Sequence, residues 1–292
     1  MRVAFLGTPA SAVASLEALI DHGHDVVVAV TRPDRRRSRG ASASASPVKA
    51  AAERRGIPVV HRVAELDHYD LERGVVVAYG AMIPASTLAR VPMLNVHFSL
   101  LPRWRGAAPV ERAILAGDRE TGVAIMTLEE SLDTGPVHLE RRVPIGDATL
   151  SELLGRLATL GAQALVEVLA DPLLLANPVA QSGEPTYAAK LDSEAFHVVP
   201  SMSVEECLRV IRLERAWALV NGSRVRLVAA HGAPGQLMVE SGTLDRREGL
   251  VVMGARAGAV IVDEVRPEGG RTMSADAWWN GHARSGESAR WG

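Results

Sequence analysis

The sequence of 292 residues predicts an α/β fold, in which a Rossmann-like part is followed by a small β-barrel. The chain opens with an apolar strand, a helix and a second apolar strand, an alternation that is typical of a parallel sheet. A segment rich in Pro, Gly, Ser and Gln follows a long helix, and short β-rich segments fill the remainder. The length suits two domains, and 47% hydrophobic residues suffice for their cores.

The elements of the first part follow from hydrophobic patterns and turn residues. Residues 2–6 are expected as a buried strand, 10–21 as a helix and 25–31 as a second strand. The turn Gly7-Thr8-Pro9 lacks the three glycines of the dinucleotide fingerprint, so a nicotinamide enzyme is disfavoured. A capping-box pattern, Thr149 followed by Glu152, opens a long helix to about residue 170. The other expected elements are a helix at 47–55, strands at 57–60 and 75–79, a strand at Asn95, a helix between 106 and 116, and strands at 122–128 and 137–143.

The second part begins after a change in composition. Residues 177–185 turn to Pro, Gly, Ser and Gln, which marks a linker. A helix is expected beyond Ser203, and strands are expected at 224–229, 236–240, 249–253 and 259–265. The expected division of the chain is 1–176 for the α/β part, 177–202 for the linker and 203–292 for the barrel.

Cysteine content and hydropathy bear on location. The single cysteine, Cys207, excludes an internal disulfide and a cysteine-rich metal site, which fits a reducing compartment, and we expect it to pack on its helix. No uninterrupted apolar segment approaches the length needed to cross a bilayer. We therefore expect a cytoplasmic protein with no membrane role.

Three polar residues form the candidate catalytic group. Asn95 and His97 lie two apart on an expected strand, so both side chains point to one face. An Asn amide can donate to a developing oxyanion, and a His can move a proton near neutral pH. Asp133 would then orient or charge the imidazole. The alternative is structural, with Asn95 capping a turn, His97 satisfied in the core and Asp133 fixing the turn at Thr134-Gly135.

The run from Asn95 to Gly135 resembles the methionyl-tRNA formyltransferase family. The wider folate-dependent formyltransferases share the Asn-x-His, Ser-Leu-Leu-Pro and Asp-Thr-Gly elements, whereas the continuation WRGAAP is similar to the tRNA-directed branch. The matching segments are NVH at 95–97, SLLP at 99–102, RWRGAAP at 103–109, GD at 117–118, ETGV at 120–123, IM at 125–126 and LDTG at 132–135, with YAAK at 187–190 and RPEGGRTMSA at 266–275 in the second part.

The resemblance implies transfer of a formyl group from 10-formyltetrahydrofolate to the α-amino group of initiator methionyl-tRNA. It implies that Asn95 is the oxyanion donor and that His97 is a second donor or a proton shuttle. Asp133 would keep His97 aligned and help to receive the amine proton. No metal is required by this chemistry, and the enzyme is expected to act as a monomer.

The resemblance also implies a folate site on two loops at the edge of the sheet. The first loop contains Tyr79, Gly80, Met82, Ile83 and Pro84, and the second contains Ser99, Leu100, Leu101 and Pro102. A pterin needs a mostly apolar slot with backbone donors and acceptors. The structural alternatives are an ordinary glycine turn for the first loop and a rigid turn for the second.

Two regions are candidate tRNA contacts. One is an arginine loop that matches an inserted loop of the family in position, although an Ala-Ser alternation at 41–45 replaces the family's lysines; its expected contacts are Arg35, Arg36, Arg37, Arg39 and Gly40. The other is the barrel, which in the family is OB-like and helps to hold tRNA. Here residues from 200 onward carry nearly balanced charges. Trp278 and Trp279 are candidates for stacking on a base or for packing.

Two alternatives to the tRNA-directed enzyme stay open from the sequence. A folate-dependent formyltransferase acting on a small amine, such as an amino sugar, is allowed by the uncharged loop tip and by an altered junction at 212–220. A catalytically idle RNA-binding paralogue is the other alternative. The intact Asn95, His97 and Asp133 count against it, and the net charge of −2 argues against indiscriminate binding of nucleic acid.

Overall fold

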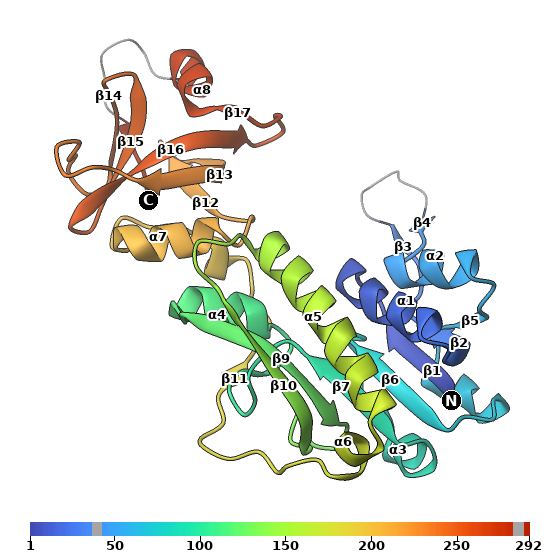
Figure 1. Ribbon diagram of the computed structural model, residues 1–292. Coiled ribbons are helices and arrows are strands. Elements are labelled where there is room, and N and C mark those ends of the chain that lie inside the picture. The colour runs from blue at the N-terminus through green and yellow to red at the C-terminus, as the bar shows by residue number, and fades with distance from the viewer. Residues whose placement is uncertain (37–42, 283–288) are drawn as a thin grey trace. The chain divides into compact units, whose positions relative to one another are not determined.

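The structure is a computed structural model that describes residues 1–36, 43–282 and 289–292. The chain forms two compact units (Figure 1). The first unit consists of Met1–Val110, Arg119–Ile145 and Leu153–Ala189. The second consists of Glu111–Asp118, Gly146–Glu152 and Lys190–Gly292.

The first unit is built on a seven-stranded sheet in the order β10-β9-β7-β6-β1-β2-β5. The strands from β7 to β5 are parallel, whereas β9 and β10 run antiparallel to their neighbours. The central strands are almost entirely buried, which explains their continuous apolar runs. The strands are β1 (Arg2–Gly7), β2 (Asp25–Val30), β5 (Val59–Val60), β6 (Arg73–Val77), β7 (Met93–His97), β9 (Glu120–Thr127) and β10 (Val137–Pro144). Two-residue ladders add β3 (Arg35–Arg36) with β4 (Ala43–Ser44), and β8 (Arg105–Gly106) with β11 (Tyr187–Ala188).

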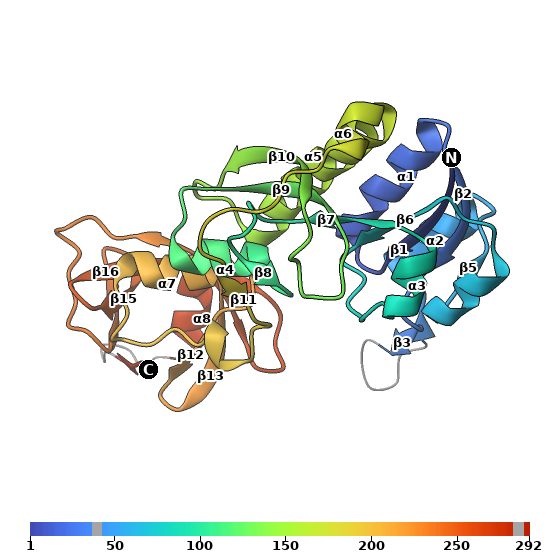
Figure 2. The same cartoon turned by 90° about the horizontal axis from the view of Figure 1, so that it is seen from below.

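Helices α1 (Val13–Asp21) and α5 (Leu150–Ala170) lie side by side over one face of this sheet (Figures 1 and 2), and residues of both line one surface groove. α5 approaches β7 closely because Gly161 has no side chain: a Cβ there would lie 2.8 Å from Val96 Cγ1. This contact fixes the strand that carries Asn95 and His97. The other helices are α2 (Pro47–Arg54), α3 (Ala85–Arg90), α4 (Pro109–Ala116) and α6 (Pro172–Ala176), with short 3-10 helices at Ala10–Ala12 and Val63–His68.

In the described part of the chain, α5 is the one helix that is long and apolar enough to cross a membrane by length and composition alone. Half of its apolar window is buried inside the protein, and the core helix of a soluble protein passes the same test. Leu153, Leu157 and Leu165 are fully buried, so α5 packs as a core helix here.

The elements expected in the first part are present, with ends that differ by a few residues. The capping box that opens α5 is confirmed. The Thr149 amide donates to Glu152 Oε2 at 2.9 Å, and the Glu152 amide donates to Thr149 Oγ1 at 3.3 Å. These two bonds satisfy amides that have no partner inside the helix.

The segment after α6 runs along the first unit. Val137 and Val179 exchange two backbone hydrogen bonds of 2.8 Å. Further on, β11 pairs in parallel with β8, and the Trp104 amide donates to Thr186 Oγ1 at 2.9 Å. Residues 177–189 therefore make specific contacts with the start of β10 and with the loop that follows β7.

The second unit is a small antiparallel barrel in the order β12-β13-β16-β15-β14-β18, with β17 paired to β16. The last described residues close it: Ala289 and Arg290 pair with β14, and Leu219 exchanges two backbone hydrogen bonds with Gly292, at 3.0 and 2.9 Å. The expected α/β part and OB-like barrel are thus both confirmed. The elements are a 3-10 helix (Glu194–Phe196), α7 (Val204–Ile211), α8 (Ala275–His282), β12 (Trp217–Val220), β13 (Ser223–Gly232), β14 (Thr243–Arg247), β15 (Leu250–Ala255), β16 (Gly258–Pro267), β17 (Met273–Ser274) and β18 (Ala289–Arg290).

The prediction of a strand at residues 236–240 in the barrel is wrong. These residues form no strand, because the Leu237 amide donates to the Pro234 carbonyl oxygen at 2.9 Å and so closes a turn. The Leu237 side chain is buried against Val252 and Ile261, so its apolar character serves packing without a ladder. The barrel also contains β12, β14, β17 and β18, which the pattern did not single out.

The core of the barrel includes Trp278, Trp279 and Cys207. Trp278 and Trp279 are 4% and 8% exposed, so both pack inside and neither offers a free face for a base. Cys207 is buried on α7, as expected, and burial raises the pKa of its thiol to about 12.

Candidate active site

The three candidate catalytic residues meet at the carboxyl end of β7. This strand lies between β6 and β9, and Asn95 and His97 project from one face of it. Asp133 arrives from the turn between β9 and β10. The exposed fractions of Asn95, His97 and Asp133 are 8%, 6% and 8%, so the group is largely shielded from solvent.

The Asp133 carboxylate is the centre of the group. Its Oδ2 accepts a hydrogen bond of 2.8 Å from the Gly106 amide and lies 3.7 Å from His97 Nδ1. Its Oδ1 accepts a long hydrogen bond of 3.5 Å from Asn95 Nδ2. The residue has φ of +50°, a left-handed conformation that Asp tolerates better than most side chains. The turn therefore aims the carboxylate at all three partners.

The imidazole of His97 is oriented by a backbone carbonyl. His97 Nε2 lies 2.9 Å from the Trp104 oxygen. Since a carbonyl oxygen only accepts, Nε2 carries the proton of this bond. Nδ1 is then the nitrogen that faces Asp133, and at 3.7 Å the two are too far apart for a direct hydrogen bond.

The Asn95 amide retains capacity to donate. An amide nitrogen carries two hydrogens, and in the described residues Asn95 Nδ2 makes the single long bond to Asp133. At 3.5 Å this bond is beyond the usual range for N–H···O. Asn95 is thus able to donate to a carbonyl oxygen placed beside His97.

Sequence reasoning missed the groups that hold the three side chains. They are the Gly106 amide, the Trp104 carbonyl and the side chain of Gln181, whose Nε2 donates to the carbonyls of Asp133 and Gly135, each at 2.8 Å. Gly106 could have been found from the sequence, because it lies in the matching segment RWRGAAP at 103–109. Its φ of +122° favours glycine, and a Cβ would lie 2.9 Å from the Ala188 oxygen. Gln181 lies in the region whose composition predicted a linker.

The first predicted folate loop follows β6. Tyr79 and Ile83 are buried, at 4% and 9% exposed, and burial raises the pKa of the Tyr79 phenol. Gly80, Met82 and Pro84 are exposed, and Met82 retains 77% of its accessible surface. The side chains of Tyr79 and Ile83 therefore anchor the loop, while its other three predicted residues are open to solvent.

The second predicted folate loop follows β7 directly. Ser99 is fully buried and its hydroxyl donates to the Arg103 oxygen at 2.6 Å. Leu101 is also buried, whereas Leu100 and Pro102 are half-buried. Ser99 and Leu101 are therefore buried directly after His97, while Leu100 and Pro102 keep partly exposed surface.

The predicted tRNA loop is described in part. Arg35 and Arg36 form β3, which pairs with β4, while Arg37, Arg39 and Gly40 lie outside the described residues. After the loop, Ser46 bonds to Thr31 at 2.7 Å, and Lys49 Nζ donates to Asp34 Oδ2 at 2.7 Å. This bond to Asp34 raises the pKa of the Lys49 ammonium group.

No group of three or more His, Cys, Asp or Glu residues suited to a metal ion occurs within residues 1–36, 43–282 and 289–292.

Both parts of the chain match known protein families. Residues 1–169 match the family described as Formyl transferase, and residues 201–283 match Formyl transferase, C-terminal domain. The methionyl-tRNA formyltransferase of Thiobacillus denitrificans is 39% identical over 98% of this chain and 98% of its own. That of Symbiobacterium thermophilum is 42% identical over 96% of this chain and 92% of its own.

Solved structures share the fold. HypX from Aquifex aeolicus, in complex with tetrahydrofolic acid, superposes with a TM-score of 0.65 at 19% identity. The match covers 96% of this chain and 47% of HypX, so this chain spans about half the length of that protein. The coverage and identity of the relatives, together with both matching domains, show that this enzyme belongs to the methionyl-tRNA formyltransferase family.

Proposed function

We propose that this enzyme transfers a formyl group from 10-formyltetrahydrofolate to the α-amino group of initiator methionyl-tRNA. The observation that carries the proposal is the convergence of Asn95, His97 and Asp133 on one shielded point, in a chain that resembles methionyl-tRNA formyltransferases over nearly its whole length. An amide donor, an imidazole and a carboxylate are the groups that acyl transfer to an amine requires.

The acceptor amine must be neutral to attack. An α-amino group titrates at roughly 7.7 to 8.0, so a useful fraction is neutral near pH 7 without a strong base. On attack a bond forms between the amine nitrogen and the formyl carbon, and negative charge develops on the formyl oxygen. Asn95 Nδ2 donates to this oxygen and stabilises the charge.

Protons then have to leave the attacking nitrogen and reach the departing one. The Asp133 carboxylate and His97 Nδ1 lie 3.7 Å apart, and both are acceptors that can take the proton from the amine. The same pair returns a proton to the leaving side as the bond to the folate nitrogen breaks. The Trp104 carbonyl holds the ring during both transfers, because His97 Nε2 remains committed to it at 2.9 Å.

The residues present fit a folate. 10-formyltetrahydrofolate supplies the formyl group, carried on N10. The loops after β6 and β7 leave the sheet at adjacent carboxyl ends, which is where open α/β sheets bind ligands. Exposed Met82 offers apolar surface, and exposed Gly80 leaves the backbone accessible. We assign the pterin to these two loops.

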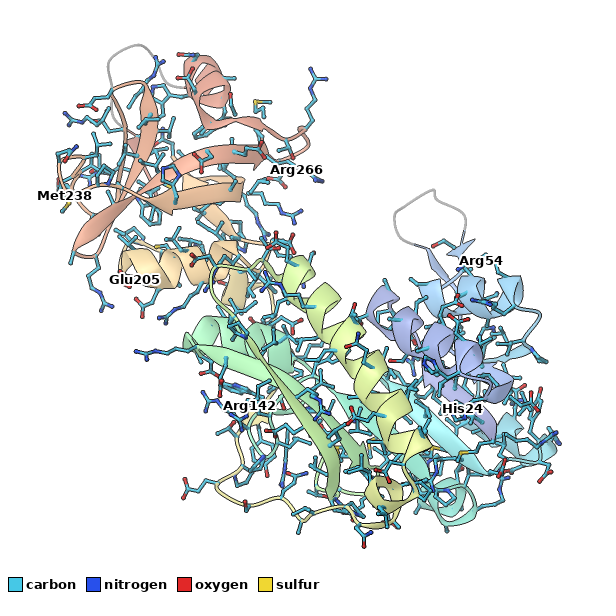
Figure 3. All side chains as sticks on the ribbon, viewed as in Figure 1. His24, Arg54, Arg142, Glu205, Met238 and Arg266 are labelled. Carbon is cyan, nitrogen blue, oxygen red and sulfur yellow. The ribbon has the colours of Figure 1, made fainter. Side chains whose placement is uncertain are left out.

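We also propose that the arginine loop at 35–40 and the barrel hold the tRNA. A pocket of about 370 Å³ in the second unit is lined by arginines from the barrel and the segment before it, and by one acidic residue, Glu268. Arg266 projects from β16 beside it (Figure 3). The four arginines are Arg215, Arg224, Arg226 and Arg266.

Two of these four arginines are positioned by contacts with aromatic rings. Arg215 lies 4.2 Å over the ring of Phe196, and Arg224 lies 4.0 Å over the ring of Trp217. In the described part of the chain, none of the four arginines forms an ion pair with a carboxylate. The balanced charge of the second part is thus locally segregated, and a phosphate group suits such a pocket.

The rest of the proposal concerns organisation. We propose that residues 1–176 form the catalytic part, that 177–202 connect it to the barrel, and that 203–292 form the tRNA-binding part. We propose further that the enzyme acts as a monomer in the cytoplasm, without a metal.

Formyl transfer to charged initiator methionyl-tRNA tests the catalytic proposal, with elongator methionyl-tRNA as the competing acceptor. Wild-type enzyme and Asp70→Ala should be active, since Asp70 is an exposed carboxylate of the same unit, whereas Asp133→Ala should lose turnover. An active Asp133→Ala variant would refute the site. Turnover on an amino sugar but not on initiator methionyl-tRNA would refute the acceptor.

Salt dependence tests the arginine pocket. The Arg224→Gln and Arg266→Gln variants should bind tRNA more weakly, and each lost phosphate contact should lower the slope of log K against log salt by roughly 0.7 to 0.9. Arg246→Gln is the matched control, because Arg246 is already paired with Asp276 at 2.6 Å. An unchanged slope in the pocket variants would remove this pocket from the tRNA site.

A further inference from the structure

Gln181 connects the turn of Asp133 to the strand of Gly106. Its Nε2 donates to the carbonyl oxygens of Asp133 and Gly135, each at 2.8 Å. Its Oε1 accepts from Arg105 Nε at 3.1 Å and from Arg105 Nη2 at 2.6 Å. Arg105, Asp133 and Gly135 all lie within the first unit, and Gln181 itself is half-buried.

The chemistry of this position suits an amide alone. A primary amide has two N–H donors and one oxygen with two lone pairs, and Gln181 uses all of them. A carboxylate at this position could accept from Arg105 but could not donate to the two carbonyls. An apolar side chain would leave the two carbonyls and the Arg105 guanidinium without these hydrogen bonds, which is costly for partly buried polar groups.

The consequence for Asp133 is that two routes tie it to the same short strand. Its side chain accepts from the Gly106 amide directly, and its backbone is joined through Gln181 to the side chain of Arg105. These ties fix a turn in which Asp133 has φ of +50°. They also set the 3.7 Å separation between Asp133 Oδ2 and His97 Nδ1.

We infer that Gln181 is a positioning residue for formyl transfer, which acts by holding the Asp133 carboxylate in place between Gly106 and His97. The inference rests on the proposed function of Asp133. Gln181 itself touches neither the amine nor the formyl group. The segment 177–185, which its composition marks as a linker, therefore also supports the site.

The Gln181→Glu variant tests the inference, because it keeps the acceptor for Arg105 and removes both donors. We expect kcat to fall about 10- to 100-fold, as for a catalytic group displaced by about 1 Å, with little change in the KM for methionyl-tRNA. Gln163→Glu is the matched control, an identical change at an exposed site on α5, and it should keep wild-type turnover.

A double variant separates positioning from a general structural effect. If Gln181 acts through Asp133, then adding Gln181→Glu to Asp133→Asn should lower kcat by less than about threefold, far less than it does in the wild type. A full 10- to 100-fold loss in that background would show that Gln181 acts elsewhere and would overturn the inference.

A third measurement does not depend on the acceptor. The Gly106 amide is bound to Asp133 Oδ2, so its hydrogen exchange should be at least about tenfold faster in Gln181→Glu than in the wild type and in Gln163→Glu. An inactive wild type with this faster exchange would refute the proposed function and keep the positioning role. Unchanged exchange would overturn the positioning role, whatever the wild type formylates.

Discussion

Replacing Gly135 by alanine should disable the site although residue 135 contributes no side chain to it. A Cβ at Gly135 would lie 1.9 Å from the Thr127 oxygen and 3.0 Å from the Thr127 carbonyl carbon. An ordinary contact needs about 3.5 Å, so the methyl group has to move by roughly 1.5 Å. Thr127 belongs to β9 and is held from outside the turn, because it pairs with Leu94 of β7 and the next amide, that of Leu128, donates to the Met93 oxygen at 2.8 Å. The turn of Asp133 is therefore the side that yields.

The size of the effect follows from what that turn carries. The Gly135 oxygen is one of the two acceptors of Gln181, and Asp133 is two residues away. Displacement of a catalytic group by about 1 Å costs on the order of 100-fold in rate, so we expect kcat to fall by about that factor. Overpacking of this kind also costs about 1–3 kcal/mol of unfolding free energy.

Initial rates with initiator methionyl-tRNA and urea unfolding measure both effects. Gly155→Ala is the matched control, because Gly155 lies on α5 and no atom lies within 4 Å of its added Cβ. That variant should gain about 0.5–1 kcal/mol in stability and keep its kcat. Wild-type kcat in Gly135→Ala would refute the reasoning, since the methyl group would then have been accommodated without moving Asp133.

Three further changes have defined outcomes. Asn95→Ala should lower kcat about 100-fold or more in the formylation assay, because an oxyanion donor is lost, and a loss below about tenfold would contradict that role. Burial raises the pKa of the Cys207 thiol from 9.0 to about 12, so the unfolded chain releases this proton first as pH rises. Stability should therefore fall between about pH 9 and 12 more steeply in the wild type than in Cys207→Ala, as urea titrations would measure. Trp279→Ala should cost about 3–5 kcal/mol by urea unfolding, since the ring is buried in the barrel, and a cost near zero would contradict its packing role.

Much of the first unit could be predicted because its signals are local. The period of a strand places Asn95 and His97 on one face without any knowledge of the partner strands. The capping box at Thr149 needs a separation of three residues, and the continuous apolar run of β6 reflects burial on both faces. Each of these inferences uses information within a single element.

The barrel and the supports of the site depend on contacts between distant parts of the chain. Leu237 has the apolar neighbours of a strand, yet a turn at Pro234 removes it from any ladder. Gln181 binds carbonyls that are 48 and 46 residues away, and its surroundings have the composition of a linker. The amino-acid composition of a segment indicates whether it can be flexible. It does not indicate which distant residues the segment contacts.

The supports are hard to predict because the atoms that hold the candidate catalytic side chains belong mostly to the backbone. His97 is oriented by a carbonyl of Trp104, and Asp133 by an amide of Gly106. A carbonyl is present whatever the side chain, so the contact to His97 constrains the conformation at residue 104, where φ is +62°, more than its identity. Gly106 is constrained in identity as well, because φ of +122° and the nearby Ala188 oxygen exclude a side chain. Sequence motifs therefore predict a chemistry for this site, and they predict its supports only where a backbone conformation demands one residue type.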